Sequence, residues 1–327
     1  MHGKIRWGIV GPGKIAHKFA KDVKITSDGV LSAVASRSVD RAQEFANEHK
    51  IPNVFGSYEA MFQSPEVDVV YIATPHNFHK QLALMAMQHG KHVLCEKPLG
   101  VNSEEVKELI RAAKDHNVFL MEGLWSRFNP SMRKVKELVD QGKIGQVSYI
   151  RADFAFYALD RDESSRLFNP ELASGSILDI GIYPIFLSYL ILGKPSAIKA
   201  FANFHPNGTE IQTSILFKYP NALSVLYSGL TSTSKMEAEI SGSEAELLLH
   251  PRWHETNSFS FKKQEELKTI ELPMKGGGLY HEIEEVHNCL KTNKLESELW
   301  SHEDSLVLAE LIDEVRRQVG VTFPFEA

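Results

Sequence analysis

A change of periodicity along the chain constrains the fold more than any other feature. Over the first 123 residues, short apolar runs alternate with amphipathic segments of helical spacing. The apolar runs are Ile5–Val10, Val30–Ala35, Val67–Ala73, His92–Cys95 and Val118–Met121. The helical patterns between them include Val39–Lys50, Asn77–Gly90 and Ser103–His116. Continuous apolar strands separated by helices predict βαβ units and a parallel sheet that is covered on both faces.

The rest of the chain has a different pattern, with longer strands that alternate between apolar and polar residues. The expected strands are Gln146–Tyr157, Ala197–His205, Glu210–Tyr219, Ala222–Leu230 and Met236–Ser241. Turn sequences such as Pro206-Asn207-Gly208 join neighbouring strands, which favours antiparallel pairing. Helical patterns cover Ser131–Gly142, Ile177–Leu192, Tyr280–Leu290 and His302–Val319. We therefore predict an α/β chain with a doubly wound parallel-sheet domain over residues 1–122. An α+β domain with a large, mostly antiparallel open sheet follows over residues 123–327.

The loop after the first strand carries a phosphate-binding signature. It reads Gly11-Pro12-Gly13-Lys14-Ile15-Ala16, which is G-x-G-x-x-A between a strand and a helix. The first glycine permits the tight turn, the second lets a pyrophosphate approach the backbone, and Ala16 lets the helix pack close to the strand. The free N–H groups of the helix then face the phosphates. This context predicts a Rossmann-type dinucleotide site, although an ordinary strand–helix turn has the same residues.

The end of the second strand indicates which dinucleotide binds. An NAD site usually has an Asp or Glu there, about 20 residues after the glycines, to bind the ribose 2′-hydroxyl. This chain has Ser36-Arg37-Ser38, and the next carboxylate is Asp40. A guanidinium and two hydroxyls suit a 2′-phosphate, so NADP is favoured over NAD. The alternative is that Arg37 is a solvated loop charge.

Composition excludes several classes of protein. The formal net charge is −6, and binding to nucleic acid needs a basic face. The apolar stretch Ile177–Leu192 is shorter than the roughly 20 residues of a bilayer crossing and predicts a buried helix. The segment Met1–Gly13 lacks a signal-peptide pattern, and the two cysteines form neither a disulfide framework nor a metal motif. We expect a cytoplasmic protein with no nucleic-acid or membrane partner.

Two further strand ends resemble a known family. They read Ala73-Thr74-Pro75-His76-Asn77-Phe78-His79 and Cys95-Glu96-Lys97-Pro98. Together with the glycine loop, they resemble the Gfo/Idh/MocA oxidoreductases, whose hallmark is a Glu-Lys-Pro tripeptide. The segments 123–130 and 178–184 look like its dihydrodiol dehydrogenase and NADP-dependent xylose dehydrogenase branch, in which tyrosine replaces a histidine. One departure is His76, where many relatives have asparagine.

The resemblance implies a role for each matching residue. Lys97 would touch the nicotinamide ribose and the substrate hydroxyl, Tyr183 would be the acid/base, and Asp179 would assist it. Pro98 would fix the loop through a cis bond. Further cofactor contacts would come from Ala73, Thr74, Pro75, His76, His79, Glu96, Trp125 and Arg127. Trp125 and Phe154 would line the substrate pocket with Lys97, Asp179 and Tyr183. The resemblance also implies homodimers through the open sheet.

These residues fit the chemistry of hydride transfer from an alcohol. A tyrosine of ordinary pKa, about 10, is a poor base at neutral pH, and a nearby ammonium favours its phenolate. We therefore expect an NADP-dependent oxidoreductase that acts on the hydroxyl-bearing carbon of a sugar, polyol or trans-dihydrodiol. No metal is expected, although His76 and His79 stand three apart.

The same residues could also have purely structural roles, and two other activities fit the sequence. Lys97 could be a surface lysine, Tyr183 a core tyrosine and Asp179 a helix cap. Trp253 and His254 lie in a polar loop, where an exposed tryptophan would mark a partner surface or pocket rim. One alternative activity is a non-catalytic NADP(H) sensor. The other is a reductase of oxo-sugars or dicarbonyls, because the direction of reaction cannot be read from residues.

Overall fold

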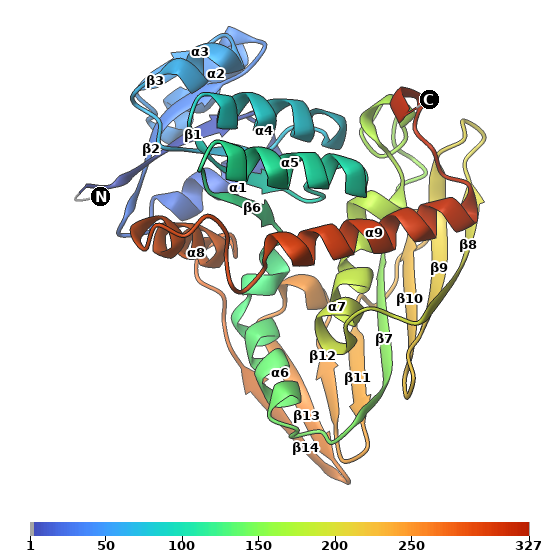
Figure 1. Ribbon diagram of the computed structural model, residues 1–327. Coiled ribbons are helices and arrows are strands. Elements are labelled where there is room, and N and C mark those ends of the chain that lie inside the picture. Colours follow the sequence, from blue (N-terminus) through green and yellow to red (C-terminus); the bar gives the residue numbers. More distant parts are fainter. Residues whose placement is uncertain (1–2, 327) are drawn as a thin grey trace. The chain divides into compact units, whose positions relative to one another are not determined.

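A computed structural model describes residues 3–326, and the chain forms two compact units (Figure 1). The first unit comprises Met1–Phe128 and Lys275–Leu306, and the second comprises Asn129–Met274 and Val307–Ala327. The chain thus crosses between the units three times. This division differs from the single boundary expected between residues 122 and 123, because the first unit also takes a segment from near the end of the chain.

The first unit is built on a six-stranded parallel sheet, as the sequence pattern predicts. Its order is β3 (Asn53–Phe55), β2 (Gly29–Ala35), β1 (Ile5–Val10), β4 (Val69–Ile72), β5 (His92–Glu96) and β6 (Leu120–Gly123). The central strands are buried on both faces, which explains their continuous apolar sequences. The three-residue β3 is only half-buried and is not among the apolar runs.

Helices with one apolar face connect these strands (Figure 1). They are α1 (Lys14–Val23), α2 (Val39–His49), α3 (Tyr58–Gln63), α4 (His79–Gln88) and α5 (Ser103–Asp115). In α1 the buried positions Ala16, Phe19, Ala20 and Val23 follow helical spacing. Side chains of Ser38, Ser57 and Asn102 accept backbone N–H bonds at the starts of α2, α3 and α5. These residues start the helices because an Asn or Ser oxygen replaces a missing backbone acceptor.

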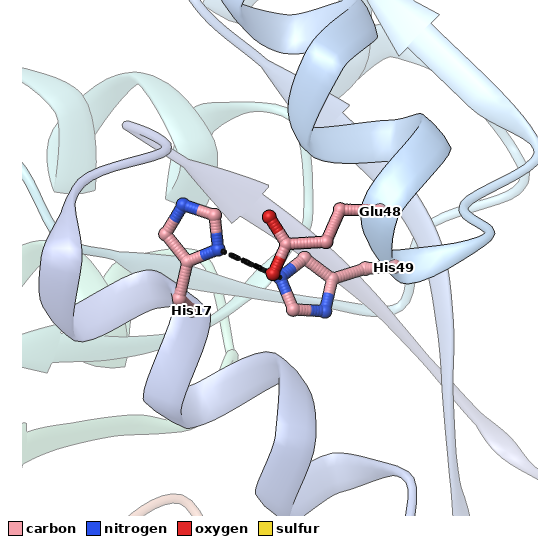
Figure 2. A group of neighbouring side chains, drawn as sticks. All are labelled: His17, Glu48 and His49. Atoms are coloured by element: carbon pink, nitrogen blue, oxygen red, sulfur yellow. Dashed lines mark hydrogen bonds and ion pairs between the residues drawn. The ribbon is translucent and has the colours of Figure 1, made fainter.

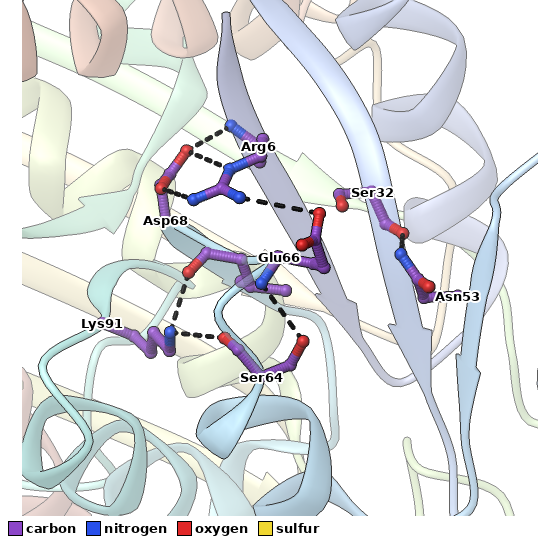
Figure 3. A network of polar contacts seen from close by, with 8 residues as sticks. Arg6, Ser32, Asn53, Ser64, Glu66, Asp68 and Lys91 are labelled. Carbon is purple, nitrogen blue, oxygen red and sulfur yellow. Dashed lines mark hydrogen bonds and ion pairs between the residues drawn. The ribbon is translucent and has the colours of Figure 1, made fainter. Parts of the chain in front are cut away.

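A polar network ties the amino ends of β1 and β4 together (Figure 3). Asp68 accepts hydrogen bonds from the backbone N–H, Nε and Nη2 of Arg6, at 2.9, 3.1 and 2.7 Å. Lys91 donates to the carbonyl oxygens of Ser64 and Val67, both at 2.8 Å. Burial alone would raise the pKa of Asp68, but the hydrogen bonds and charge of Arg6 outweigh it and lower this pKa.

The late segment joins the first unit through α8 (Tyr280–Lys291), which packs against α1. The indole N–H of Trp7 donates to Nε2 of His287 at 2.9 Å. Asp22 accepts from the backbone N–H of Gly277 at 2.6 Å and of Tyr280 at 2.9 Å. These bonds span more than 250 positions of sequence, and the helical pattern of α8 alone carries no information about its partner.

The second unit contains an eight-stranded, mostly antiparallel sheet, which agrees with the prediction. Its order is β14 (Glu266–Glu271), β13 (Ser258–Lys263), β12 (Glu246–Leu249), β11 (Ala238–Gly242), β7 (Val147–Ala155), β10 (Leu223–Gly229), β9 (Glu210–Lys218) and β8 (Ala197–Phe204). Within this eight-stranded sheet, β7 and β10 pair in parallel and the other described pairs are antiparallel. The strands named from the sequence did not include β12, which has four residues, or β13 and β14, of which β14 is largely exposed.

One face of this sheet is covered by helices. The unit holds α6 (Pro130–Asp140), α7 (Ile182–Leu192) and most of α9 (His302–Val319), and α7 packs on β7 and β10. The segment Pro170–Leu192 is long and apolar enough to cross a membrane by composition. However, 78% of its most apolar window is buried inside the unit, as in the core helix of a globular domain. The expected buried helix is therefore confirmed.

The other face of the sheet presents apolar side chains to solvent. Alternate residues of β9 and β10 point to the two faces, so Leu216 and Val225 are exposed while Ile215 and Leu226 are buried. The exposed large apolar residues on β8, β9 and β10 are Phe201, Phe204, Leu216, Leu223 and Val225. We call these five residues the apolar strip.

Candidate active site

The glycine loop has the geometry that the sequence predicts. Gly11 has a φ of +87°, and a Cβ there would lie 3.0 Å from Cγ2 of Thr74. Gly13 is the N-cap of α1 and supplies no side-chain cap, so the first N–H groups of the helix face outward. A Cβ on Gly13 would meet no protein atom nearer than the Ala73 carbonyl oxygen at 4.0 Å. Packing therefore explains Gly11, whereas Gly13 borders open space at a helix N-terminus, which suits a phosphate.

Thr74 supports this fit with an unsatisfied hydroxyl. Its Oγ1 is buried and has no hydrogen-bond partner among the described residues, although it lies in the loop that touches Gly11. A buried hydroxyl without a partner costs free energy, and an oxygen of a bound ligand would satisfy it. Ala73 and Pro75 flank this hydroxyl at the end of β4.

Arg37 lies where a residue that binds the 2′-phosphate of NADP is expected. It is exposed at the end of β2, and its guanidinium lies 5.4 Å from the ring centroid of Phe78. Its neighbours are partly used by the fold: Oγ of Ser36 accepts from the N–H of Ser38 at 3.2 Å, and Oγ of Ser38 caps α2. The guanidinium is thus the most available of the three predicted groups for a dianion.

His79 is fully buried and contacts both the loop after β4 and the loop after β5. Its Nδ1 lies 2.8 Å from the carbonyl oxygen of Pro98, and its Nε2 lies 2.9 Å from that of Thr74. Burial lowers the pKa of His79, whereas the two acceptors favour its protonated form. A neutral ring can donate to only one of them. His79 therefore positions the β4 and β5 loops, because each of its two ring nitrogens lies against a carbonyl oxygen of one of these loops.

Lys97 stands at the carboxyl end of β5, half-buried, and its bond to Pro98 is cis, as the resemblance implies. The preceding Glu96 accepts a short hydrogen bond from the hydroxyl of Tyr71. Burial raises the pKa of the Glu96 carboxyl, although Tyr71 and Lys97 pull it down. Because the Glu96 carboxyl is held inward by Tyr71, its predicted contact with the cofactor would come from the backbone.

Glu282 on α8 was not predicted as part of this region. It is fully buried, and neither carboxyl oxygen has a hydrogen-bond partner among the described residues. Burial and the nearby charges of Glu96 and Asp22 raise the pKa of Glu282 far above its ordinary value, while Lys18 lowers it. Two nearby carboxyls in a buried region cannot both be ionised at low cost, so the surroundings of Glu282 favour its protonated form.

The loop after β6 supplies Trp125 and Arg127. The Trp125 ring is mostly buried, and Nζ of Lys18 lies 4.0 Å from its centroid. Glu122 holds this loop to the β5 loop, because it accepts from the N–H of Leu99 at 3.0 Å and from the Trp300 indole at 3.1 Å. Glu122 and Trp300 had not been singled out from the sequence.

In the second unit, Asp179 lies in a π-helical turn, Ile177–Gly181, that leads into α7. Its carboxylate accepts from Nη1 of Arg166 at 2.6 Å. Asp179 is therefore paired instead of capping a helix, and Arg166 is a site residue that the sequence did not indicate. Pro184 falls in the first turn of α7, where proline fits.

Tyr183 packs in an aromatic cluster with Phe154 and His254. Its ring centroid lies 5.6 Å from that of Phe154 and 5.1 Å from that of His254, and the latter two rings stack at 4.2 Å. His254 thus belongs to the candidate substrate site, which the sequence left open. Trp253 is 1% exposed and donates to the carbonyl of Asp153, so the expectation of an exposed tryptophan is wrong.

A buried carboxylate on β9 anchors the turn that carries Asp179. Glu210 accepts from Oγ of Ser176 at 2.7 Å, from the N–H of Ile177 at 2.9 Å and from Oγ1 of Thr213 at 2.7 Å. Burial raises the pKa of Glu210, and these three donors counteract the rise. The bonds fix the turn to the sheet and hence the direction of the helix that presents Tyr183.

The fold and these residues define a Rossmann-type, NADP-dependent oxidoreductase. The glycine loop, the orphan Thr74 hydroxyl and Arg37 fit the dinucleotide, and Lys97 ends the fifth parallel strand. Residues 5–124 match the model of the oxidoreductase family with an NAD-binding Rossmann fold, and residues 132–248 match that of the GFO/IDH/MocA C-terminal domain. The chain belongs to the Gfo/Idh/MocA oxidoreductase family.

Known relatives are similar over nearly the full length. The chain is 36% identical to a trans-1,2-dihydrobenzene-1,2-diol dehydrogenase of Mus musculus and 34% identical to that of Homo sapiens, each over 98% of both chains. A 3-ketoreductase from Actinomadura kijaniata, crystallised with NADP and TDP-benzene, matches with a TM-score of 0.87 and 25% identity, covering 97% of this chain and 98% of that one. An aldose-aldose oxidoreductase from Caulobacter crescentus shares the fold, with a TM-score of 0.88, 22% identity and the same coverage.

We predict that Gly13→Ala weakens NADP binding without unfolding the protein. Gly13 has φ −93° and ψ −175°, which alanine adopts freely, so the added methyl meets only the space assigned to the phosphates. Fluorescence titration is expected to show an NADP affinity lower by about tenfold or more, roughly 1.4 kcal/mol. The melting temperature should not fall. Gly3→Ala, also in open space, serves as the control, and equal affinity in both variants would contradict the assignment.

We predict that Glu282→Gln stabilises the protein increasingly as pH rises. The folded-state pKa of Glu282 exceeds its unfolded value, so the wild type loses stability when pH climbs from the unfolded pKa through the folded one. Glutamine mimics the protonated carboxyl and removes this loss. Urea unfolding should show little change near pH 5 and a gain of about 1–3 kcal/mol near pH 8. The exposed Glu44→Gln variant should show neither change, and a pH-independent effect at Glu282 would refute the assignment.

Proposed function

We propose that the protein oxidises a secondary hydroxyl of a cyclic vicinal diol or sugar, with NADP as the hydride acceptor. The observation that carries this proposal is the start of α7, where Tyr183 lies beside the Phe154 and His254 rings and directly follows the π-helical turn with Asp179. Flat aromatic faces suit a ring substrate, and the polar groups suit its hydroxyls. The full-length similarity to trans-dihydrodiol dehydrogenases supports a diol as substrate.

The proposed reaction assigns one task to each residue. The phenolate oxygen of Tyr183 would accept the substrate hydroxyl proton and become a hydroxyl, and Lys97 would favour the phenolate form. Asp179 would hold the preceding turn through its ion pair with Arg166. The nicotinamide supplies the site that receives the hydride. Lys97 and Tyr183 belong to different units, so the proposal requires that both reach one substrate. Reduction of an oxo-sugar or dicarbonyl would use the same residues in reverse.

We predict that Tyr183→Phe lowers kcat by about 100-fold or more and changes the NADP affinity little. The measurement is a spectrophotometric assay with trans-dihydrodiols, pentoses, hexoses and inositols, with NADP and with NAD, beside a cofactor titration. Tyr219→Phe is the matched control, because Tyr219 is also a buried tyrosine of the second unit and bonds to Ser188. A weakened NADP affinity with unchanged kcat would refute the role of Tyr183. Cofactor binding without turnover on any substrate would favour the sensor.

We also propose that two copies of the chain associate through the apolar strip. Leu216 on β9 pairs directly with Val225 on β10, and Phe201 and Phe204 add exposed apolar side chains on the neighbouring strand β8. A contiguous exposed apolar patch of this kind usually marks an interface, and a two-fold dimer would cover it with itself. The two cysteines are buried free thiols, which suits the expected cytoplasmic location.

We predict that the wild type sediments as a dimer and that Leu216→Lys sediments as a monomer. The lysine would place a charge in the centre of the strip, while its exposed position leaves the fold intact. Leu267→Lys is the control, because Leu267 is even more exposed than Leu216 but lies on β14, outside the strip. A monomeric wild type, or a dimeric Leu216→Lys, would contradict the proposal.

A further inference from the structure

A second constellation lies between α1 and α2 of the first unit, in His17, Glu48 and His49 (Figure 2). Three ligand-type atoms converge there. Nδ1 of His17 lies 2.9 Å from Nε2 of His49, and Oε1 of Glu48 lies 3.3 Å from the first and 3.4 Å from the second. Each of these three atoms is close to the other two, so His17 Nδ1, His49 Nε2 and Glu48 Oε1 form a small triangle.

The triangle has nearly the size of a face of a zinc coordination sphere. Zinc binds imidazole nitrogen and carboxylate oxygen at about 2.0–2.2 Å in tetrahedral geometry, which separates neighbouring ligand atoms by about 3.3–3.5 Å. Both distances to Glu48 meet this value. The distance between the two imidazoles is shorter, so the rings would need to open by a few tenths of an ångström. We propose that His17, Glu48 and His49 bind Zn²⁺, with water as the fourth ligand.

The surroundings of the triangle favour a cation site. Phe45 packs against both imidazoles, at centroid distances of 4.6 and 4.5 Å, and so limits the rotation of the ligands. His49 is buried, while the His17 side chain is 36% exposed and that of Glu48 is 54% exposed. An ion can therefore enter from solvent and keep a water.

Two positive charges oppose the ion and set its affinity. Lys21 and Lys24 lie near enough to lower the pKa of His49 together with His17, and Glu48 counteracts them. The local charge before binding is thus not strongly negative. We expect an affinity below that of four-ligand structural zinc sites, which use thiolates.

The other His-carboxylate group of the described residues, Asp28, Glu284 and His287, is a poorer candidate. Nε2 of His287 already accepts from the Trp7 indole, and Asp28 is paired with Lys291 at 2.6 Å. A metal there would have to displace this lysine. This second group serves as an internal comparison, because it also contains histidine and carboxylate side chains, but these already bond to Trp7 and Lys291.

The experiment is a titration of chelator-treated full-length protein with Zn²⁺, in competition with a chromophoric zinc chelator. We expect the wild type to bind one equivalent. His17→Asn and Glu48→Gln should each lower the association constant by about tenfold or more, which is about 1.4 kcal/mol. His89→Asn, at an exposed histidine, and Glu284→Gln, in the comparison group, should bind like the wild type.

Two further readouts separate a ligand role from a structural one. Zn²⁺ should raise the melting temperature of the wild type and of His89→Asn but not of His17→Asn. Co²⁺ should give the intense visible bands of tetrahedral coordination only where both His17 and Glu48 are intact. Equal melting temperatures of all variants without metal confirm that folding is preserved. The proposal fails if His17→Asn and the wild type bind zinc equally, or if Glu284→Gln abolishes binding.

Discussion

The parallel pairing of β1 with β2 on one side and with β4 on the other is the constraint on which the first unit depends. It brings the carboxyl ends of consecutive strands to one edge of the sheet, and the loops after them carry Gly13, Arg37, Thr74 and Lys97. Residues far apart in sequence therefore share one edge of the sheet. At the opposite edge of the sheet, the hydrogen bonds between Arg6 and Asp68 join the amino ends of β1 and β4 and so help to fix the register of these two strands.

Buried carboxyl groups connect this architecture to the site. Glu122 and Glu210 accept hydrogen bonds from backbone N–H groups of segments that carry site residues, and Glu96 accepts one from Tyr71 on β4. These hydrogen bonds offset the cost of burying the acids. Glu282 differs, because it makes no such bond among the described residues and its surroundings favour the neutral acid. The charge of Glu96, which directly precedes Lys97 in the chain, raises the pKa of Glu282 on α8.

Much of the fold could be predicted because its signals are local. Strand and helix types follow from the spacing of apolar residues, and the buried α7 follows from a continuous apolar run. The strands named from the sequence did not include β12, which has only four residues, or β14, which is largely exposed. They also did not include β13, although its sequence SFSFKK alternates between polar and apolar residues. The prediction also assigned α8 to the second domain, because an amphipathic pattern shows that a helix has a buried face but not which sheet buries it.

The sequence by itself determined the parallel sheet, the phosphate loop, the arginine at the end of β2 and the Lys97–Pro98 strand end. Each is specified by neighbouring residues, through backbone conformation, periodicity or a short motif. Only the tertiary structure decided that Arg166 pairs with Asp179, that His254 lies against Tyr183, and that His17 meets His49. Such contacts depend on how helices and loops pack, and no local spacing encodes the packing of segments from different parts of the chain.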